Sequence, residues 1–242
     1  MTIAENVQMV RDQIAAACAK AKRDPASVTL VAVSKTHPAS VVLEAAACGL
    51  QHFGENRVEE STTKIPAVMA QTDLPLIWHM IGHIQSRKAK EIPPLYQVVH
   101  SVDTLKLAER LSREVVERGG SLDVLLEVNI SGEASKAGFA AYGWVQNAET
   151  RATLEQEIAQ IAALPGLKLR GLMTMAPIVE DMEQARPVFA GLAALRAALE
   201  NSLGTALPDL SMGMTDDFPV AIEEGATLVR IGRALFGERE KV

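Results

Sequence analysis

Lys35 is the residue whose type and position most directly suggest chemistry. It ends the apolar segment VTLVAVSK, and the two-residue period of a strand puts it on the same face as Val31 and Val33. Desolvation at such a position disfavours the ammonium form and leaves a free amine that can attack an aldehyde. A lysine at a strand end can also simply extend into solvent. The proposed role of Lys35 therefore needs support from elsewhere in the chain.

The segment SMGMTDDFPVAIEEGATLVRIGRALFG, residues 211–237, contains two loops of a kind that binds phosphate. Ser211 and Gly213 begin a small polar loop that leads into a helix, and Gly232 with Arg233 follows a further apolar strand. In α/β barrels the loops after the seventh and eighth strands commonly bind phosphate through backbone amides and a short helix N-terminus. Either glycine alone could serve only a tight turn. The two loops in this order favour a phosphate site.

Arg230 precedes Gly232 by two residues, so both face the same side of the last predicted strand. A guanidinium directed into a barrel needs a partner, either a carboxylate such as Glu127 or an atom of a bound ligand. The sequence pattern favours neither partner over the other.

Metal and disulfide chemistry find little support. His79 and His83 are four residues apart on a predicted strand, where that spacing separates them by about 13 Å, too far to share one ion. Cys18 and Cys48 lie in segments of helical pattern without metal-ligand spacing. We expect no metal site and no disulfide.

The elements that must position Lys35 and the two loops alternate between strands and helices. Eight short apolar segments are predicted as strands: residues 28–35, 52–55, 77–82, 97–102, 123–129, 168–175, 209–213 and 227–232. Segments of helical period fill the gaps, and an amphipathic helix over 3–22 precedes the first strand. This pattern predicts an α/β fold, a (β/α)8 TIM barrel with an extra N-terminal helix, in a single domain over residues 1–242.

Three local features complete the predicted barrel. We expect Asp103 to cap the helix after the fourth strand and Gly119 to end it. Pro187 must either kink the helix over 182–199 or lie in its first turn. The segment 130–150 is long for a connector, which is typical of a lid, a binding loop or a mobile segment.

The composition limits the classes of partner. A content of 48% hydrophobic and 22% charged residues is typical of a globular protein, and no apolar stretch approaches the length of a membrane helix. Charged residues near the N-terminus disfavour a secretory signal peptide. The formal net charge of −6 disfavours nucleic acid as a partner. We therefore expect a cytoplasmic protein with neither a nucleic-acid nor a membrane partner.

The sequence resembles the pyridoxal phosphate homeostasis proteins, a family of single-domain pyridoxal 5'-phosphate (PLP) carriers related to the barrel domain of alanine racemase. The resemblance rests on segments that follow one another along almost the whole chain: VAVSKTHP (31–38), HFGENRVEE (52–60), WHMIGHIQSRK (78–88), VHSVD (99–103), LLEVNISGEASKAGF (125–139), GLMTMAP (171–177) and residues 211–237. Residues 1–242 would then form a single alanine-racemase-like, PLP-binding barrel domain.

The resemblance also implies a set of cofactor-binding residues. Lys35 would bind PLP as a Schiff base. Ser211, Gly232 and Arg233 would bind the phosphate, partly through main-chain amides.

Around the cofactor ring, the resemblance implies contacts with Asn56 and Met80, with Met173 lining the barrel beneath it. Arg230 would lie near the pyridine nitrogen. A positive charge there keeps the nitrogen unprotonated and makes the ring a weaker electron sink. A decarboxylase or transaminase is therefore disfavoured, whereas a racemase or a carrier is not.

A racemase needs a proton donor on each face of the reacting carbon. Lys35 can serve one face. The related racemases take the second group from an added β domain, for which we expect no residues after the eighth unit. Tyr142 in the long connector is the remaining candidate, although its segment AAYGW is equally typical of an aromatic loop anchor.

We therefore expect a carrier or buffer in intracellular PLP homeostasis, with no catalytic residue and little or no catalysis. PLP-dependent apoenzymes are the expected recipients. A monomer is expected, because the β domain that supplies the usual dimer contact is missing. The first alternative is a monomeric PLP-dependent amino-acid racemase that uses Tyr142 or a water. The second is an aldolase-like barrel in which Lys35 attacks a phosphorylated sugar.

Overall fold

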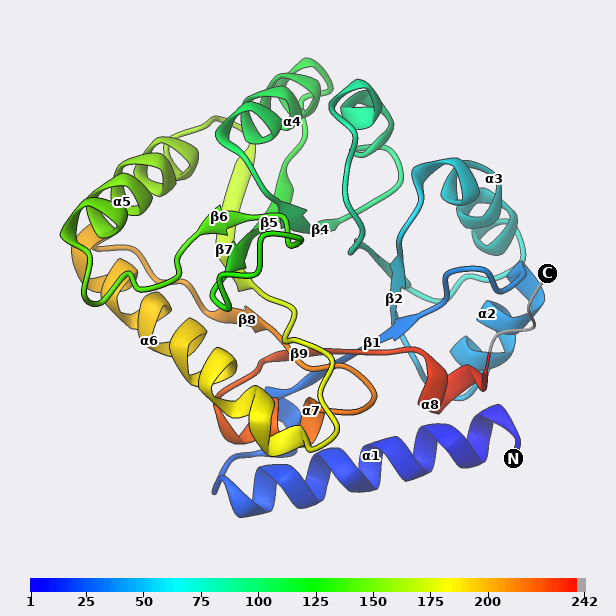
Figure 1. Cartoon of the computed structure of the whole chain (residues 1–242). Helices are drawn as coiled ribbons and strands as arrows, with labels where there is room; N and C mark the ends of the chain where they lie inside the picture. The colour runs from blue at the N-terminus through cyan, green and yellow to red at the C-terminus, as the bar shows by residue number, and fades with distance from the viewer. Residues whose placement is uncertain (239–242) are drawn as a thin grey trace.

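Parallel strands close into a barrel with helices around it in the computed structural model, which describes residues 1–238 (Figure 1). The eight barrel strands are β1 (Thr29–Val33), β2 (His52–Glu55), β3 (Ile77–Met80), β4 (Val98–Val102), β5 (Leu122–Asn129), β7 (Leu167–Met173), β8 (Asp209–Ser211) and β9 (Leu228–Ile231). Pairing of β1 with β9 and of β4 with β5 closes the ring. The two-residue strand β6 (Phe139–Ala140) lies outside the ring and pairs with β5. The predicted (β/α)8 barrel is confirmed.

The helices cover the outside of the barrel. They are α1 (Ile3–Lys20), α2 (Ala39–Ala47), α3 (Val58–Met69), α4 (Leu105–Glu117), α5 (Ala148–Ala162), α6 (Arg186–Leu203), α7 (Phe218–Glu223) and α8 (Arg233–Phe236), with the 3-10 helices η1 (Pro25–Ser27), η2 (Ser86–Glu91) and η3 (Met182–Ala185). No helix within residues 1–238 is both long enough and apolar enough to cross a membrane. The predicted domain also includes residues 239–242, which lie outside the described part.

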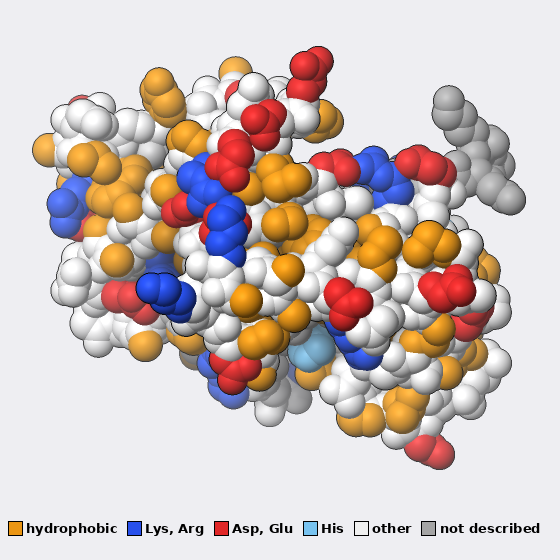
Figure 2. Space-filling model, turned by 90° about the horizontal axis from the view of Figure 1, so that it is seen from below, with side chains coloured by type: hydrophobic (Ala, Val, Ile, Leu, Met, Phe, Trp, Pro, Cys, Tyr) orange, Lys and Arg blue, Asp and Glu red, His pale blue; other side chains and the backbone are white. Residues whose placement is uncertain are grey.

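The predicted N-terminal helix is α1, which packs against α7 and α8 (Figure 1). Thr2 caps it in a capping box with Glu5, which satisfies free amides of the first turn. The face of the molecule that carries α1 mixes acidic and basic side chains (Figure 2). Among its ion pairs are those of Glu223 with Lys20 and Arg186, both at 2.7 Å.

Side chains point alternately outward and inward along each strand, so the protein has one interior between the strands and the helices and another inside the barrel. The outward side chains, such as Phe53 and Trp78, form the large core between strands and helices. The inward side chains include a smaller apolar cluster of Val31, Leu125, Met173 and Leu228. Polar side chains also face the inside of the barrel: His52 and Arg230 stand in register with Val31, and Ser211 and Glu127 stand in register with Met173.

Two of the local predictions are confirmed and one is wrong. Gly119 follows α4 with φ of 65°, a left-handed conformation that suits glycine at a helix end. Pro187 lies in the first turn of α6 and causes no kink there. Thr104, and not Asp103, caps α4, because the hydroxyl of Thr104 accepts a hydrogen bond from the amide of Leu107. Asp103 Oδ2 instead lies 3.0 Å from His83 Nδ1.

Several strands end before their predicted last residue. β1 ends at Val33 and not at 35, and β8 ends at Ser211 and not at 213. The residues that follow Val33 and Ser211 belong instead to the loops at the carboxyl end of the barrel. Active-site groups of barrel enzymes are found at this end.

Candidate functional site

A cavity of about 440 Å³ lies at the carboxyl ends of β1 and β9. Its lining residues are Val33, Lys35, His37, Gly232, Arg233, Gly237 and Glu238. Two parts of the chain that are about two hundred residues apart meet there, because β1 and β9 are neighbours in the barrel. The structure thus brings Lys35 together with the Gly232–Arg233 turn.

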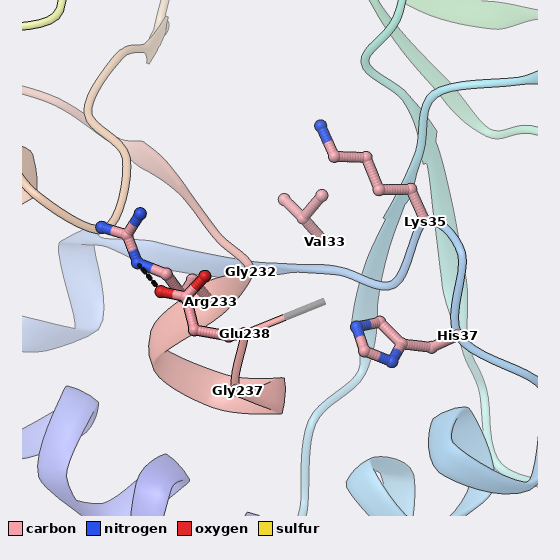
Figure 3. A pocket seen from close by; sticks show the side chains of 7 residues that line it. All are labelled: Val33, Lys35, His37, Gly232, Arg233, Gly237 and Glu238. Atoms are coloured by element: carbon pink, nitrogen blue, oxygen red, sulfur yellow. Dashed lines mark ion pairs between the residues drawn. The ribbon is translucent and has the colours of Figure 1, made fainter. Parts of the chain in front are cut away.

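Lys35 follows β1 and is half-buried. Its side chain extends across the cavity above Val33, and the turn at Gly232 and Arg233 lies on the other side (Figure 3). Val31, Val33 and Lys35 share the inward face, as the period of two predicts. Lys35 therefore reaches into the cavity from the wall of the barrel.

The backbone around Lys35 is held on both sides. The amide of Ser34 donates to the carbonyl of Gly54 at 3.0 Å, which continues the pairing with β2. Thr36 has φ of 70°, a left-handed conformation that is unfavourable for a residue with a branched side chain. Its amide donates to Glu60 Oε1 at 2.8 Å. These contacts fix the direction in which Lys35 leaves the strand.

A buried ion pair supports this turn from behind. Lys64 Nζ lies 2.9 Å from Glu55 Oε1 and donates to the carbonyl of Ser34 at 2.9 Å, and it also contacts Glu60. The hydroxyl of Ser34 donates to Glu55 at 2.6 Å. Burial raises the pKa of Glu55, and the hydrogen bond from Ser34 and the charge of Lys64 oppose that rise. Sequence reasoning missed this network.

The Gly232–Arg233 turn begins α8. The first amides of a helix have no partner within it and are suited to bind an anion. The guanidinium of Arg233 is engaged with carboxylates, because it contacts Asp216 and lies 3.4 Å from Glu238 (Figure 3). The main-chain amides of this turn are therefore better suited to bind a phosphate than the Arg233 side chain.

Ser211 is not among the residues that line this cavity. It is fully buried, and its oxygen accepts from Arg230 Nη1 at 2.6 Å and lies 2.8 Å from His100 Nδ1. After Ser211 the chain turns tightly at Gly213, where φ is 93° and an added Cβ would come within 2.7 Å of the Cβ of Ala221. The turn thus requires glycine.

Arg230 is buried inside the barrel. Besides Ser211 it donates to the carbonyl of Thr174 at 3.0 Å. Burial lowers its pKa to about 10, and the charges of Asp217 and Glu127 oppose that shift. Glu127, one of the two partners considered from the sequence, therefore acts on Arg230 through its charge, whereas the direct partners are a hydroxyl and a carbonyl.

The three residues expected around a cofactor ring are placed differently. Asn56 follows β2, and its Oδ1 is buried without a hydrogen-bond partner. Met173 belongs to the small apolar cluster inside the barrel. Met80 is fully buried in the outer core with Trp78, because the alternation that turns His79 inward turns Met80 outward. The structure does not bring Met80 to the cavity.

Three inward histidines form a group that sequence reasoning missed. His52 is half-exposed, whereas His79 and His100 are buried. Burial lowers the pKa of His79 to about 3 and holds the pKa of His100 well below its ordinary range. Because the pKa of each of the three histidines is lowered from its ordinary value, these rings are neutral near pH 7. Within residues 1–238, no cluster of three or more His, Cys, Asp or Glu residues could hold a metal ion.

The buried His79 makes folding sensitive to acid. Between pH 6.5, its ordinary pKa, and about 3, the unfolded chain binds a proton that the folded protein does not bind, so acidification favours unfolding. We expect His79 to account for about 2 kcal/mol of lost stability between pH 7 and pH 5. Urea unfolding at both pH values should show a smaller loss in His79→Asn than in the unchanged protein. An equal loss in the two proteins would contradict the prediction. Glu55 and Glu127, whose pKa values burial raises, oppose the trend equally in both.

Neither tyrosine belongs to the cavity of Lys35. Tyr142 is 71% exposed and lies against Gly132, beside a different cavity that Trp144 and Ile130 also line. Tyr96 is buried and donates to Ser61, and burial raises its pKa. No second acid or base of this type therefore stands opposite Lys35.

The family of the chain follows from this fold and from its relatives. Residues 3–240 match the model of the alanine racemase N-terminal domain. An alanine racemase of Clostridium difficile 630 shares the fold at 14% identity with a TM-score of 0.67, over 98% of this chain and 58% of the racemase. The fold and its cavity thus define a barrel of the alanine racemase N-terminal type.

Within that class, the chain belongs to the family of the pyridoxal phosphate homeostasis proteins. It is 48% identical to the pyridoxal phosphate homeostasis protein of Pseudomonas aeruginosa, over 99% of this chain and 96% of the relative. The Escherichia coli K12 protein of the same name is 40% identical, over 98% and 97%. The structure of PipY of Synechococcus elongatus with PLP bound has a TM-score of 0.82 at 36% identity, over 98% and 100%. The family resemblance predicted from the sequence is confirmed.

Proposed function

We propose that this protein binds PLP through Lys35 and acts as a carrier or buffer of that cofactor, with little or no catalysis. The observation that carries the proposal is the cavity in which Lys35 faces the Gly232–Arg233 turn. PLP supplies an aldehyde that condenses with an amine, and an anionic phosphate. The relatives named for PLP homeostasis and PipY with its bound PLP support the same function.

The residues present fit PLP at both ends. Lys35 supplies the amine that forms the Schiff base, and the amides of Gly232 and Arg233 supply donors for the phosphate. The buried Oδ1 of Asn56, which has no partner among the described residues, is an acceptor that a bound ligand would satisfy. Arg230 disfavours protonation of a nearby pyridine nitrogen, because both groups would then be positive. Ser211 contributes through its hydrogen bond to Arg230.

The carrier interpretation is preferred over the racemase for a geometric reason. A racemase needs a second proton donor within hydrogen-bond reach of the reacting carbon. Tyr142, the sequence candidate, borders a different cavity and is largely exposed. The proposal includes PLP-dependent apoenzymes as recipients, a monomeric protein and action in the cytoplasm.

The proposal is tested with the purified full-length protein and added PLP. Reduction with borohydride should fix the cofactor on the peptide that contains Lys35, as seen by mass spectrometry. In a separate sample that has not been reduced, incubation with amino acids in deuterated water should show no exchange at the α-carbon above that of free PLP. Rapid exchange would favour the racemase, and reduction with no label at Lys35 would overturn the proposed site.

A further inference from the structure

A continuous chain of hydrogen bonds crosses the inside of the barrel. His52 Nδ1 lies 2.9 Å from His79 Nε2, and His79 Nδ1 lies 2.8 Å from His100 Nε2. His100 Nδ1 lies 2.8 Å from Ser211 Oγ, which accepts from Arg230 Nη1 at 2.6 Å. This chain of hydrogen bonds thus connects Arg230, near the carboxyl end of the barrel, with His52, the first residue of β2.

Neutral imidazole allows this chain only two proton arrangements. Each neutral ring has one N–H donor and one acceptor nitrogen. Both nitrogens of His79 and both of His100 are engaged in the chain, so each ring must donate on one side and accept on the other. The three histidines therefore carry their protons either all on Nδ1 or all on Nε2. A mixed arrangement would set two donors or two acceptors against each other.

Arg230 selects between the two arrangements. A guanidinium can only donate, so Ser211 Oγ must accept at that contact. If all three protons were on Nδ1, Ser211 would also accept from His100, and its own proton would need a third partner. Ser211 is fully buried and has no other hydrogen-bond partner among the described residues. An unsatisfied buried hydroxyl is unfavourable, so Ser211 donates to His100.

The far end of the chain can satisfy this direction. With protons on Nε2, the last donor is His52 Nε2. His52 is half-exposed and borders a second cavity, of about 420 Å³, together with Thr29 and Leu30 at the start of β1. Water can accept that proton, whereas the interior of the barrel could not. All the donors then point one way, from Arg230 to His52.

We propose that Ser211, His100, His79 and His52 are positioning residues for Arg230, joined in a hydrogen-bond chain that runs in this single direction. The chain of hydrogen bonds keeps the Ser211 oxygen turned toward Nη1 of Arg230, and the carbonyl of Thr174 accepts from Nη2. The meaning of this positioning for the cofactor rests on the proposed function, because there Arg230 lies near the pyridine nitrogen. The direction of the chain itself does not depend on PLP.

The direction of the hydrogen-bond chain is tested by nitrogen-15 NMR of the histidine rings in the full-length protein without PLP. The protein has five histidines, and single replacements assign their signals. His52, His79 and His100 should all carry the proton on Nε2 at pH 7. A proton on Nδ1 of His79 or His100, or a charged ring at either position, would overturn the inference.

The positioning role is tested by the exchange of the Arg230 guanidinium. In Ser211→Ala the guanidinium loses one acceptor, so its N–H signals should broaden and exchange faster with water than in the unchanged protein. His83→Gln is the matched control, since His83 is exposed and pairs with Asp103 outside the chain of hydrogen bonds. Unchanged Arg230 exchange in Ser211→Ala would overturn the positioning role. Failure of the unchanged protein to bind PLP would overturn the proposed function instead.

Discussion

Lys35→Ala will abolish borohydride-stable labelling by PLP, because it removes the amine that reaches into the cavity beside the Gly232–Arg233 turn. The visible absorbance of the bound cofactor should be lost with it. The affinity for PLP should fall by about tenfold or more, which corresponds to at least about 1.4 kcal/mol of binding free energy. Mass spectrometry after reduction and a titration with PLP measure the two effects.

Inorganic phosphate should still compete for the site in Lys35→Ala, because the main-chain amides proposed for the phosphate remain. Lys106→Ala is the matched control, since Lys106 is an exposed lysine on α4. It should label and titrate like the unchanged protein. A fully labelled Lys35→Ala protein would show that another lysine carries the cofactor. Loss of phosphate competition would contradict the assignment of the Gly232–Arg233 turn.

The barrel was predictable because its strands leave a strong local pattern. Each of the eight predicted segments overlaps a barrel strand, and the segment 52–55 matches β2 residue for residue. The inward direction of Lys35 also follows from local alternation with Val31 and Val33. The ends of β1 and β8 were less predictable, because the residues that follow Val33 and Ser211 still make hydrogen bonds to neighbouring strands although they no longer belong to the sheet.

The polar interior depends on register, which one sequence does not reveal. His52, His79 and His100 are each a polar residue within a strand segment, in HFGE, IWHM and VVHSV. Their repetition on three successive strands was the available signal. Contact between them also requires that Gly54 stand beside His79 and that His79 stand beside Val98. The outward direction of Met80, by contrast, followed from alternation with His79.

Lys64 shows a second limit of sequence reasoning. It lies at a buried position of α3 between Ser61 and Ile65, where the helical period places it on the core face. That signal was available, but its partner Glu55 belongs to the preceding strand, and only the packing of α3 on β2 brings the charges together. The resulting pair supports the turn that contains Lys35 through Ser34.

Glu55→Ala should destabilise the protein by about 3 to 5 kcal/mol, because it leaves the Lys64 ammonium buried without its main counter-charge. Glu55 is fully buried and Lys64 is 7% exposed, so water cannot replace the lost carboxylate. Urea unfolding at pH 7 measures the change, and Glu91→Ala is the control, since the Lys88–Glu91 pair is partly exposed and its loss should cost much less. A loss for Glu55→Ala as small as the loss for Glu91→Ala would contradict the prediction. If the pair also holds the turn, Glu55→Ala protein that remains folded will bind PLP more weakly, because the Ser34 hydroxyl loses its acceptor and Lys64, which donates to the Ser34 carbonyl, loses the carboxylate that positions it.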